Sequence, residues 1–221
     1  MRWWRMGSSR AVPRALVRGA TCAVLGLCAL VAGAGAQTPA APEIRVRIDT
    51  DHGAIVLALD PAHAPKTVAN FLKYVDGGYY TGGRFHRATR PDNYKPAPPD
   101  RPPMQIIQGG INPDRAGEAK AAIPPVPLER TTVTGLKHVA GVVSMARGAE
   151  ADSGTSDFFI LLDDQPSMDV GGKRYPDGQG FAAFGRVVEG LDVVRKINAQ
   201  PVKEQSLDPP VPIRGITRQT R

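Results

Sequence analysis

Cysteine is nearly absent from this sequence of 221 residues, and its two cysteines, Cys22 and Cys28, both lie within the first 36 residues. The rest of the chain therefore needs no disulfide and offers no thiol chemistry. The sequence has only four histidines, and no two of them are spaced as in a metal-binding motif. A Gly-x-Ser-x-Gly elbow, a phosphate-binding glycine loop and a dinucleotide fingerprint are missing as well. Hydrolytic, redox and metal chemistry thus lack their usual residues, and we expect neither a metal nor a cofactor.

Acidic residues are missing from the first 36 residues, and this explains the positive charge of the chain. The formal net charge is +7 at pH 7, from 28 basic and 21 acidic residues. Five of the basic residues lie in that first segment: Arg2, Arg5, Arg10, Arg14 and Arg18. The rest of the chain is close to neutral and has no excess of basic residues for phosphates. We therefore expect no nucleic-acid partner.

The first 36 residues have the pattern of a secretory signal peptide. An arginine-rich start precedes the uncharged stretch Gly19–Ala36, which ends in a small-x-small motif. We expect cleavage before Gln37, a short linker over residues 37–42, and one globular domain over residues 43–221. The alternative is an uncleaved membrane anchor, because 18 uncharged residues can just span a bilayer. Glycines within the stretch favour cleavage, so we expect a periplasmic or secreted protein that no longer contacts a membrane.

Aromatic residues make up only 6% of the chain, whereas turn-forming residues are plentiful, with 24 Gly and 21 Pro. This composition is typical of a turn-rich, β-rich fold. Alternating polar and apolar residues predict strands over residues 43–50, 54–59, 84–87, 105–108, 141–146, 158–162, 181–187 and 212–217. Helical spacing predicts one helix that begins at Pro65 and ends at Gly77, and a second over Leu191–Ala199. Many short strands with two helices favour a closed antiparallel barrel.

Five short motifs stand out along the chain: Phe85-His86-Arg87, Ile106–Gly110 (IIQGG), Gly141–Arg147 (GVVSMAR), Ser153–Ile160 (SGTSDFFI) and Phe184–Val187 (FGRV). In sequence and in order they resemble segments of the cyclophilin family of peptidyl-prolyl cis/trans isomerases. Glu129 followed by Gly135-Leu136-Lys137 resembles a stretch of the family's bacterial branch. The resemblance covers about Glu43 to Thr217. The predicted signal peptide over residues 1–36 indicates an exported member of the family.

The resemblance implies a closed eight-stranded antiparallel β-barrel capped by two α-helices, which agrees with the pattern of predicted strands and helices. It also implies an isomerase that acts on Xaa-Pro bonds without a metal or a cofactor. The partners would be proline-containing unfolded or partly folded polypeptides. Such bonds isomerise slowly enough to limit folding. We therefore expect a foldase for exported proteins, working as a monomer.

The family's motif places the catalytic chemistry on Arg87. A prolyl peptide bond has a rotation barrier of ~20 kcal/mol because the nitrogen lone pair is shared into the carbonyl group. A donor held near the prolyl nitrogen competes for that lone pair and lowers the barrier. A guanidinium suits this role, since it is always charged and holds its donors in a rigid fork. The resemblance also implies that Gln108 holds a substrate carbonyl and orients Arg87.

A proline ring needs an apolar pocket, which stabilises it by ~1.5–3 kcal/mol on full burial. The motifs imply that the walls of this pocket are Ile106, Phe159, Met168 and Phe181. They further imply that Phe85 contributes to substrate binding, and that Ala146 and the backbone of Arg147 line the groove for neighbouring substrate residues. The alternative for Ile106 and Phe159 is an ordinary place in the barrel core.

Three residues depart from the family's pattern. Gln105 stands where the family has an aromatic pocket residue, Ser167 where it has Trp or Phe, and Asp157 where it has Gln. These polar residues predict a wetter, weaker pocket and argue against the binding of cyclosporin-like macrocycles. They leave open a non-catalytic proline-binding or chaperone module with the same fold. A hydrolase that uses His86 is a third alternative, although alternation along the strand predicts a buried, structural His86 facing away from Arg87.

The segment 88–103 contains six prolines, which excludes a central strand. It replaces a connection of a few residues in typical cyclophilins and directly follows Arg87. One interpretation is a lid or substrate-selecting loop that presents its own Xaa-Pro bonds, and the other is a solvated surface excursion. Unchanged turnover and peptide affinity after shortening this loop would reject the lid.

Overall fold

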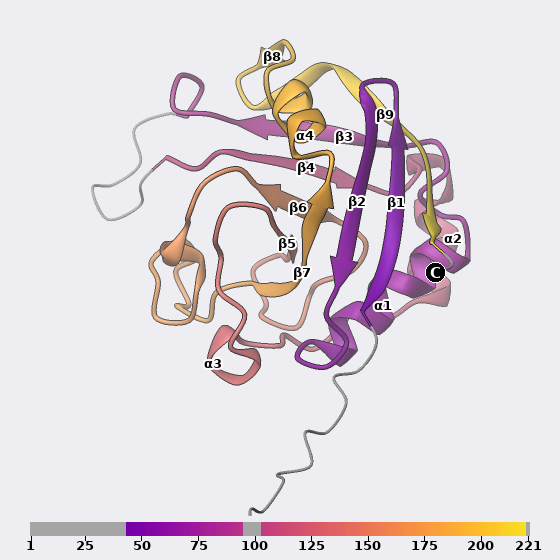
Figure 1. Cartoon of the computed structure of the whole chain (residues 1–221). Coiled ribbons are helices and arrows are strands. Elements are labelled where there is room, and N and C mark those ends of the chain that lie inside the picture. The colour runs from indigo at the N-terminus through magenta and orange to yellow at the C-terminus, as the bar shows by residue number, and fades with distance from the viewer. Residues whose placement is uncertain (1–42, 95–102, 220–221) are drawn as a thin grey trace, which may run out of the picture. The chain divides into compact units, whose positions relative to one another are not determined.

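The computed structural model describes residues 43–94 and 103–219, whose strands form a closed antiparallel barrel (Figure 1). The predicted signal peptide (1–36) and linker (37–42) lie outside the described residues, as does the middle of the proline-rich segment, 95–102. Among the helices of the described part, none is long and apolar enough to cross a membrane.

Antiparallel pairing runs all the way around the barrel. In ring order its strands are β1 (Ile44–Thr50), β2 (Gly53–Leu59), β7 (Ala182–Glu189), β5 (Val142–Met145), β6 (Phe158–Leu161), β4 (Ile106–Gly110), β3 (Gly83–Thr89) and β9 (Ser206–Arg218). The pairing of β9 with β1 closes the ring. A two-residue strand, β8 (Val202–Lys203), pairs only with β9. The predicted eight-stranded barrel is confirmed.

Helices α1 (Pro65–Asp76) and α4 (Leu191–Asn198) correspond to the two predicted helices. The structure adds two short helices, α2 (Ala116–Ala122) and α3 (Thr131–Thr134), and two 3-10 turns, Pro113–Arg115 and Pro166–Met168. The sequence pattern missed α2 and α3 because a helix of one or two turns is too short to show an apolar periodicity.

The predicted final strand is too short in the sequence interpretation, since β9 begins at Ser206 and not at Pro212. Prolines argued against a strand there because they cannot donate to a ladder. In the structure the pairing of β9 with β3 is irregular between Ser206 and Val211, and Pro209 and Pro210 lie within that irregular stretch. The N–H groups that Pro209 and Pro210 lack therefore fall where the ladder with β3 is interrupted.

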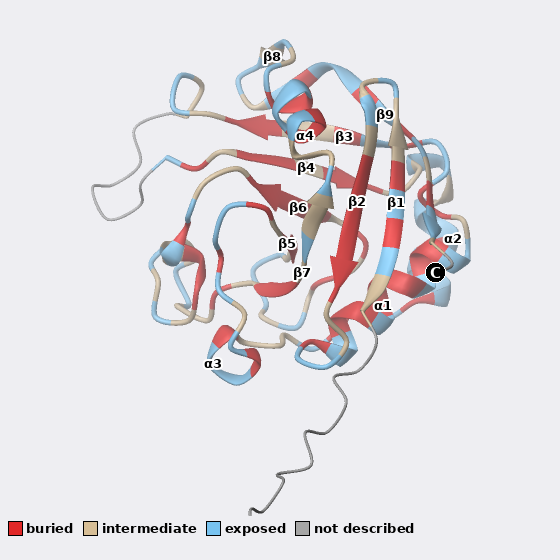
Figure 2. Ribbon diagram, in the orientation of Figure 1, coloured by how far each residue is buried: buried red, intermediate tan, exposed pale blue. Residues whose placement is uncertain are grey.

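Strand alternation divides the apolar residues of β4 and β6 between two separate clusters. Ile107, Phe158 and Ile160 point into the barrel and join its main core. Their neighbours Ile106, Phe159 and Leu161 belong to a second cluster on the outer face. Both sets are buried, so β4 and β6 are coloured as buried along most of their length in Figure 2. The second cluster forms the apolar part of the candidate site.

Candidate active site

The strand pairing lines up the site residues across the outer face of the barrel. Arg87 on β3 lies opposite Gln108 on β4, and Gln108 lies opposite Phe159 on β6. Residues directly opposite each other project from the same face of an antiparallel sheet. Ile106, two residues from Gln108, shares that face. The barrel thus sets a guanidinium, an amide and an aromatic ring in one row.

Two amide oxygens hold the Arg87 guanidinium. Its Nη1 donates to Gln108 Oε1 at 3.2 Å. Its Nε and Nη2 both donate to Gln205 Oε1, at 3.0 and 2.6 Å. Since a guanidinium has five N–H donors, two remain for a ligand, and no other acceptor among the described residues takes them.

The Arg87 side chain is half-buried, and no carboxylate among the described residues pairs with it. Burial lowers the pKa of Arg87 from its ordinary value, the nearby charge of Arg174 lowers it too, and Tyr94 opposes them. An arginine remains protonated at neutral pH even so. Because both of its partners are neutral amides, the field of this cation is available to a group that approaches it.

Asp157 fixes the orientation of the Gln108 amide. Gln108 Nε2 donates to Asp157 Oδ2 at 3.4 Å, which leaves Gln108 Oε1 facing Arg87. His86 Nε2 lies 3.6 Å from the same carboxylate oxygen. A Cβ on Gly110 would come within 2.2 Å of Asp157 Oδ1, so the carboxylate needs a glycine at that position. The sequence identified Asp157 only as a departure, and the structure makes it a partner of Gln108.

The prediction of a buried His86 is wrong, because 37% of its side chain is exposed. The register shifts between Phe85 and Arg87 on both sides of β3, and this bulge removes His86 from regular alternation. The hydrolase alternative has no support at His86, since within residues 43–94 and 103–219 no hydroxyl group forms a hydrogen bond with it.

The prediction that Phe85 contacts substrate is also wrong. Its side chain is fully buried in the main core, and its ring centroid lies 5.9 Å from that of Phe158 in an edge-to-face contact. Phe85 points to the barrel interior because it precedes the bulge, whereas Arg87 follows it. The residue stabilises the strand that carries Arg87.

The predicted pocket residues do come together. Ile106, Phe159 and Met168 belong to the outer cluster, and Ala146 and Phe181 pack against it. The rings of Phe159 and Phe181 meet edge to face with centroids 5.6 Å apart. The arrangement separates these residues from the barrel core, so the core alternative for Ile106 and Phe159 does not hold.

Sequence reasoning missed four residues of this cluster: Val142, Leu161, Tyr94 and Met104. Tyr94 and Met104 lie on either side of the undescribed part of the proline-rich segment. The Arg174 guanidinium lies 4.8 Å from the centroid of the Tyr94 ring. Tyr94 thereby adds an aromatic ring that neither Gln105 nor Ser167 supplies. No sequence signal could have found it, because the segment 88–103 replaces a shorter connection of typical cyclophilins and carries no family motif.

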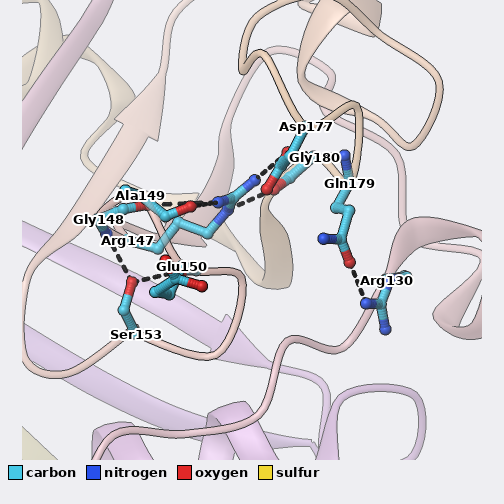
Figure 3. A network of polar contacts seen from close by, with 9 residues as sticks. All are labelled: Arg130, Arg147, Gly148, Ala149, Glu150, Ser153, Asp177, Gln179 and Gly180. Atoms are coloured by element: carbon cyan, nitrogen blue, oxygen red, sulfur yellow. Dashed lines mark hydrogen bonds and ion pairs between the residues drawn. The ribbon is translucent and has the colours of Figure 1, made fainter.

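The Arg147 side chain packs against Phe181, which belongs to the edge of the apolar cluster. The side chain is 2% exposed, and its Nη2 lies 2.7 Å from Asp177 Oδ1. Its Nε donates to the carbonyl oxygen of Gly180 at 2.8 Å, as Figure 3 shows. The guanidinium also lies 4.1 Å from the Tyr175 ring centroid and 5.3 Å from that of Phe181. Arg147 therefore positions the loop that presents Phe181, a role that the sequence did not indicate.

A buried polar network lies against Phe159. His138 is wholly buried, its Nδ1 lies 2.8 Å from Asp169 Oδ1, and its Nε2 lies 2.9 Å from Ser144 Oγ. The imidazole stacks on the Phe159 ring at a centroid distance of 6.5 Å. Burial by itself would raise the pKa of Asp169, but hydrogen bonds and charge from His138, with Lys137, hold it below its ordinary value. The network was not predicted.

Asp169 makes the stability of the protein depend on acid pH. A carboxyl group whose pKa is lower in the folded than in the unfolded chain stabilises the fold above its unfolded pKa, here 3.8. That contribution is lost as the pH falls through the lower, folded-state value. We expect the urea midpoint of the protein to fall below about pH 4, and to fall less steeply in Asp169→Asn. Glu150→Gln, an exposed control, should follow the wild-type curve, and parallel curves for all three proteins would refute the assignment.

The described residues contain no group of three or more His, Cys, Asp or Glu side chains that could hold a metal ion. The available chemistry is that of a half-buried guanidinium and an oriented amide beside an apolar cluster.

The chain is similar to known proteins in sequence and in fold over nearly all of the described residues. Residues 45–218 match the family described as cyclophilin type peptidyl-prolyl cis-trans isomerase/CLD. Peptidyl-prolyl cis-trans isomerase A of Dickeya dadantii is 36% identical over 182 residues, covering 82% of this chain and 83% of its own. Peptidyl-prolyl cis-trans isomerase B of Escherichia coli is 31% identical over 167 residues, covering 76% and 92%. A crystal structure of a Cryptosporidium parvum cyclophilin type isomerase has a similar fold, with a TM-score of 0.64 at 24% identity over 81% of this chain and 99% of its own.

Proposed function

This chain belongs to the cyclophilin family and is a peptidyl-prolyl cis-trans isomerase, and we propose that it uses Arg87 to isomerise Xaa-Pro bonds of exported proteins. The observation that carries the assignment of Arg87 is its geometry. A half-buried guanidinium, with no carboxylate partner among the described residues, stands in the same row as the apolar cluster that would receive a proline ring.

The mechanism needs no proton transfer and no covalent intermediate. The proline ring enters the cluster around Phe159, and the two remaining N–H groups of Arg87 face the prolyl nitrogen. Donation to that nitrogen withdraws its lone pair from the carbonyl group and makes the peptide bond more like a single bond. A barrier lowered by about 7 kcal/mol corresponds to roughly 10⁵-fold acceleration. Gln108 holds a substrate carbonyl group while Asp157 keeps its amide in place.

The test of this function is exchange NMR on a short Xaa-Pro peptide with and without the protein. We expect cis-to-trans exchange to accelerate in its presence. If the protein is folded and binds the peptide but leaves exchange unchanged, the chain is a proline-recognising module and the proposal fails.

Gln205 is a positioning residue for Arg87, and its replacement tests the geometry. Gln205 Oε1 accepts from two nitrogens of Arg87, and hydrogen bonds to charged groups contribute roughly 1.5–3 kcal/mol each. We expect Gln205→Leu to lower kcat by about 10-fold or more and to change KM little, because Gln205 does not belong to the apolar cluster. An unchanged kcat in Gln205→Leu would contradict this role.

The export of the protein rests on its first 36 residues, with their arginine-rich start and uncharged stretch. Removal of this leader before Gln37 would release a periplasmic or secreted, monomeric foldase. Intact mass measurement of the protein from fractionated cells tests this directly. A full-length mass, or recovery only with membranes, would reject cleavage and favour the membrane-anchor alternative.

A further inference from the structure

Beside the active site lies a groove of about 770 Å³ that the proposed mechanism does not use. Helix α2, the start of β3 and the segment Thr155–Asp157 line it, and α2 stands next to the start of β3 in Figure 1. Its volume falls within the range of ordinary ligand sites. The catalytic residue Arg87 is not among its lining residues, so the groove is a separate feature.

The groove has a rigid wall and an apolar lining. Asn70 Nδ2 donates to the carbonyl oxygen of Thr155 at 2.6 Å, and the Tyr80 hydroxyl donates to that of Ser156 at 2.6 Å. These bonds fasten the wall to α1 and to the residues that follow it. The apolar lining comes from Ile111, Pro113, Ala116, Ala119, Ile123 and Pro125. A preformed apolar surface of this kind binds an apolar segment without reorganisation.

The charges around the groove are mostly positive. Arg84 and Lys120 line it, and Asp157 is the one carboxylate among its described lining residues. Arg84 and Lys120 are exposed, and no described residue forms an ion pair with either. Asp157 already accepts from Gln108 and faces His86. The two cations at the rim therefore favour an occupant that carries negative charge.

The groove is continuous with the active site through two residues. His86 directly precedes Arg87 on β3, and Asp157 contacts both His86 and Gln108. A polypeptide whose proline lies in the apolar cluster can extend along this boundary into the groove at about 3.3 Å per residue. We propose that the groove is an extended substrate site that binds an apolar segment bearing Asp or Glu a few residues from the proline. This inference rests on the proposed function.

The test compares two peptides that differ in one charge. Each contains one Xaa-Pro bond and an apolar segment with either Glu or Gln three to five residues from the proline, on each side in turn. When the charge lies on the side of the proline that reaches the groove, we expect the Glu peptide to have a kcat/KM about 3- to 10-fold higher than the Gln peptide at low salt. The advantage should lie in KM and fade at high ionic strength.

Charge reversal identifies the groove as the source of this preference. We expect Lys120→Glu to abolish or invert the preference for the Glu peptide over the Gln peptide. Lys196→Glu, on α4 outside the groove, is the matched control and should keep the preference. Equal kcat/KM for both peptides in the wild type, or an unchanged preference in Lys120→Glu, would overturn the inference.

A binding measurement separates failure of the groove from failure of the enzyme. Fluorescence anisotropy of labelled peptides with the Arg87→Ala variant reports affinity without turnover. A preference for Glu in this assay supports the groove even if the wild type proves inactive. Equally tight binding of a short single-stranded DNA would show a general polyanion site and refute a peptide groove.

Discussion

Arg87→Ala is expected to lower kcat/KM for Xaa-Pro isomerisation by about 10²- to 10³-fold, the usual cost of removing one preorganised donor from an active site. The loss should fall mainly on kcat, because the apolar cluster that binds the proline ring remains intact. Exchange NMR at saturating peptide measures this. The variant also leaves Gln108 and Gln205 without their shared partner, so its thermal unfolding must be compared with that of the wild type.

Two matched variants make the Arg87 result interpretable. Arg214 also lies on a strand but pairs with Asp51 on an exposed surface, and Arg214→Ala should retain full activity. Arg87→Lys keeps the charge and loses the rigid fork, so we expect it to recover only a small part of the lost rate. Full activity in Arg87→Ala would preserve the family's reaction and move its chemistry to another residue.

Phe159→Ala is expected to be the most destabilising single change at the site. The side chain is 3% exposed and contacts the rings of Phe181 and His138. Truncation of a buried phenylalanine typically costs about 3–5 kcal/mol of unfolding free energy. A urea titration should show a lower midpoint at an unchanged slope. Where the variant remains folded, the KM for proline peptides should rise because the pocket has lost its main wall.

A graded series tests whether packing is the cause. Phe159→Leu keeps most of the apolar volume and should lose much less stability and affinity than the alanine variant. Val133→Ala, at a site 83% exposed, should change neither quantity. If Phe159→Ala raised KM with no loss of stability, the cluster would be a preformed pocket that contributes little to the fold.

Whether the placement of a residue could be predicted depends on how far along the chain the residues that contact it lie. Ile106 and Phe159 lie in one cluster, as the resemblance implied, because they project from one face of two strands that pair directly. Phe85 and His86 were misassigned, because a bulge between Phe85 and Arg87 depends on the strands at both sides. A bulge inserts one residue into the ladder and leaves no reliable mark in local sequence.

The sequence predicted the barrel class and the pattern of strands and helices, apart from α2, α3 and the first half of β9. Through the family resemblance it also named Arg87 and Gln108 as candidate site residues. These features depend on local periodicity, turn residues and short motifs. The tertiary structure alone decided what holds Arg87 and what completes the apolar cluster. Gln205 lies 118 residues from Arg87, and Tyr94 meets Arg174 across the site. Such contacts exist only once the ring of strands has closed, because closure brings segments together that no local pattern relates.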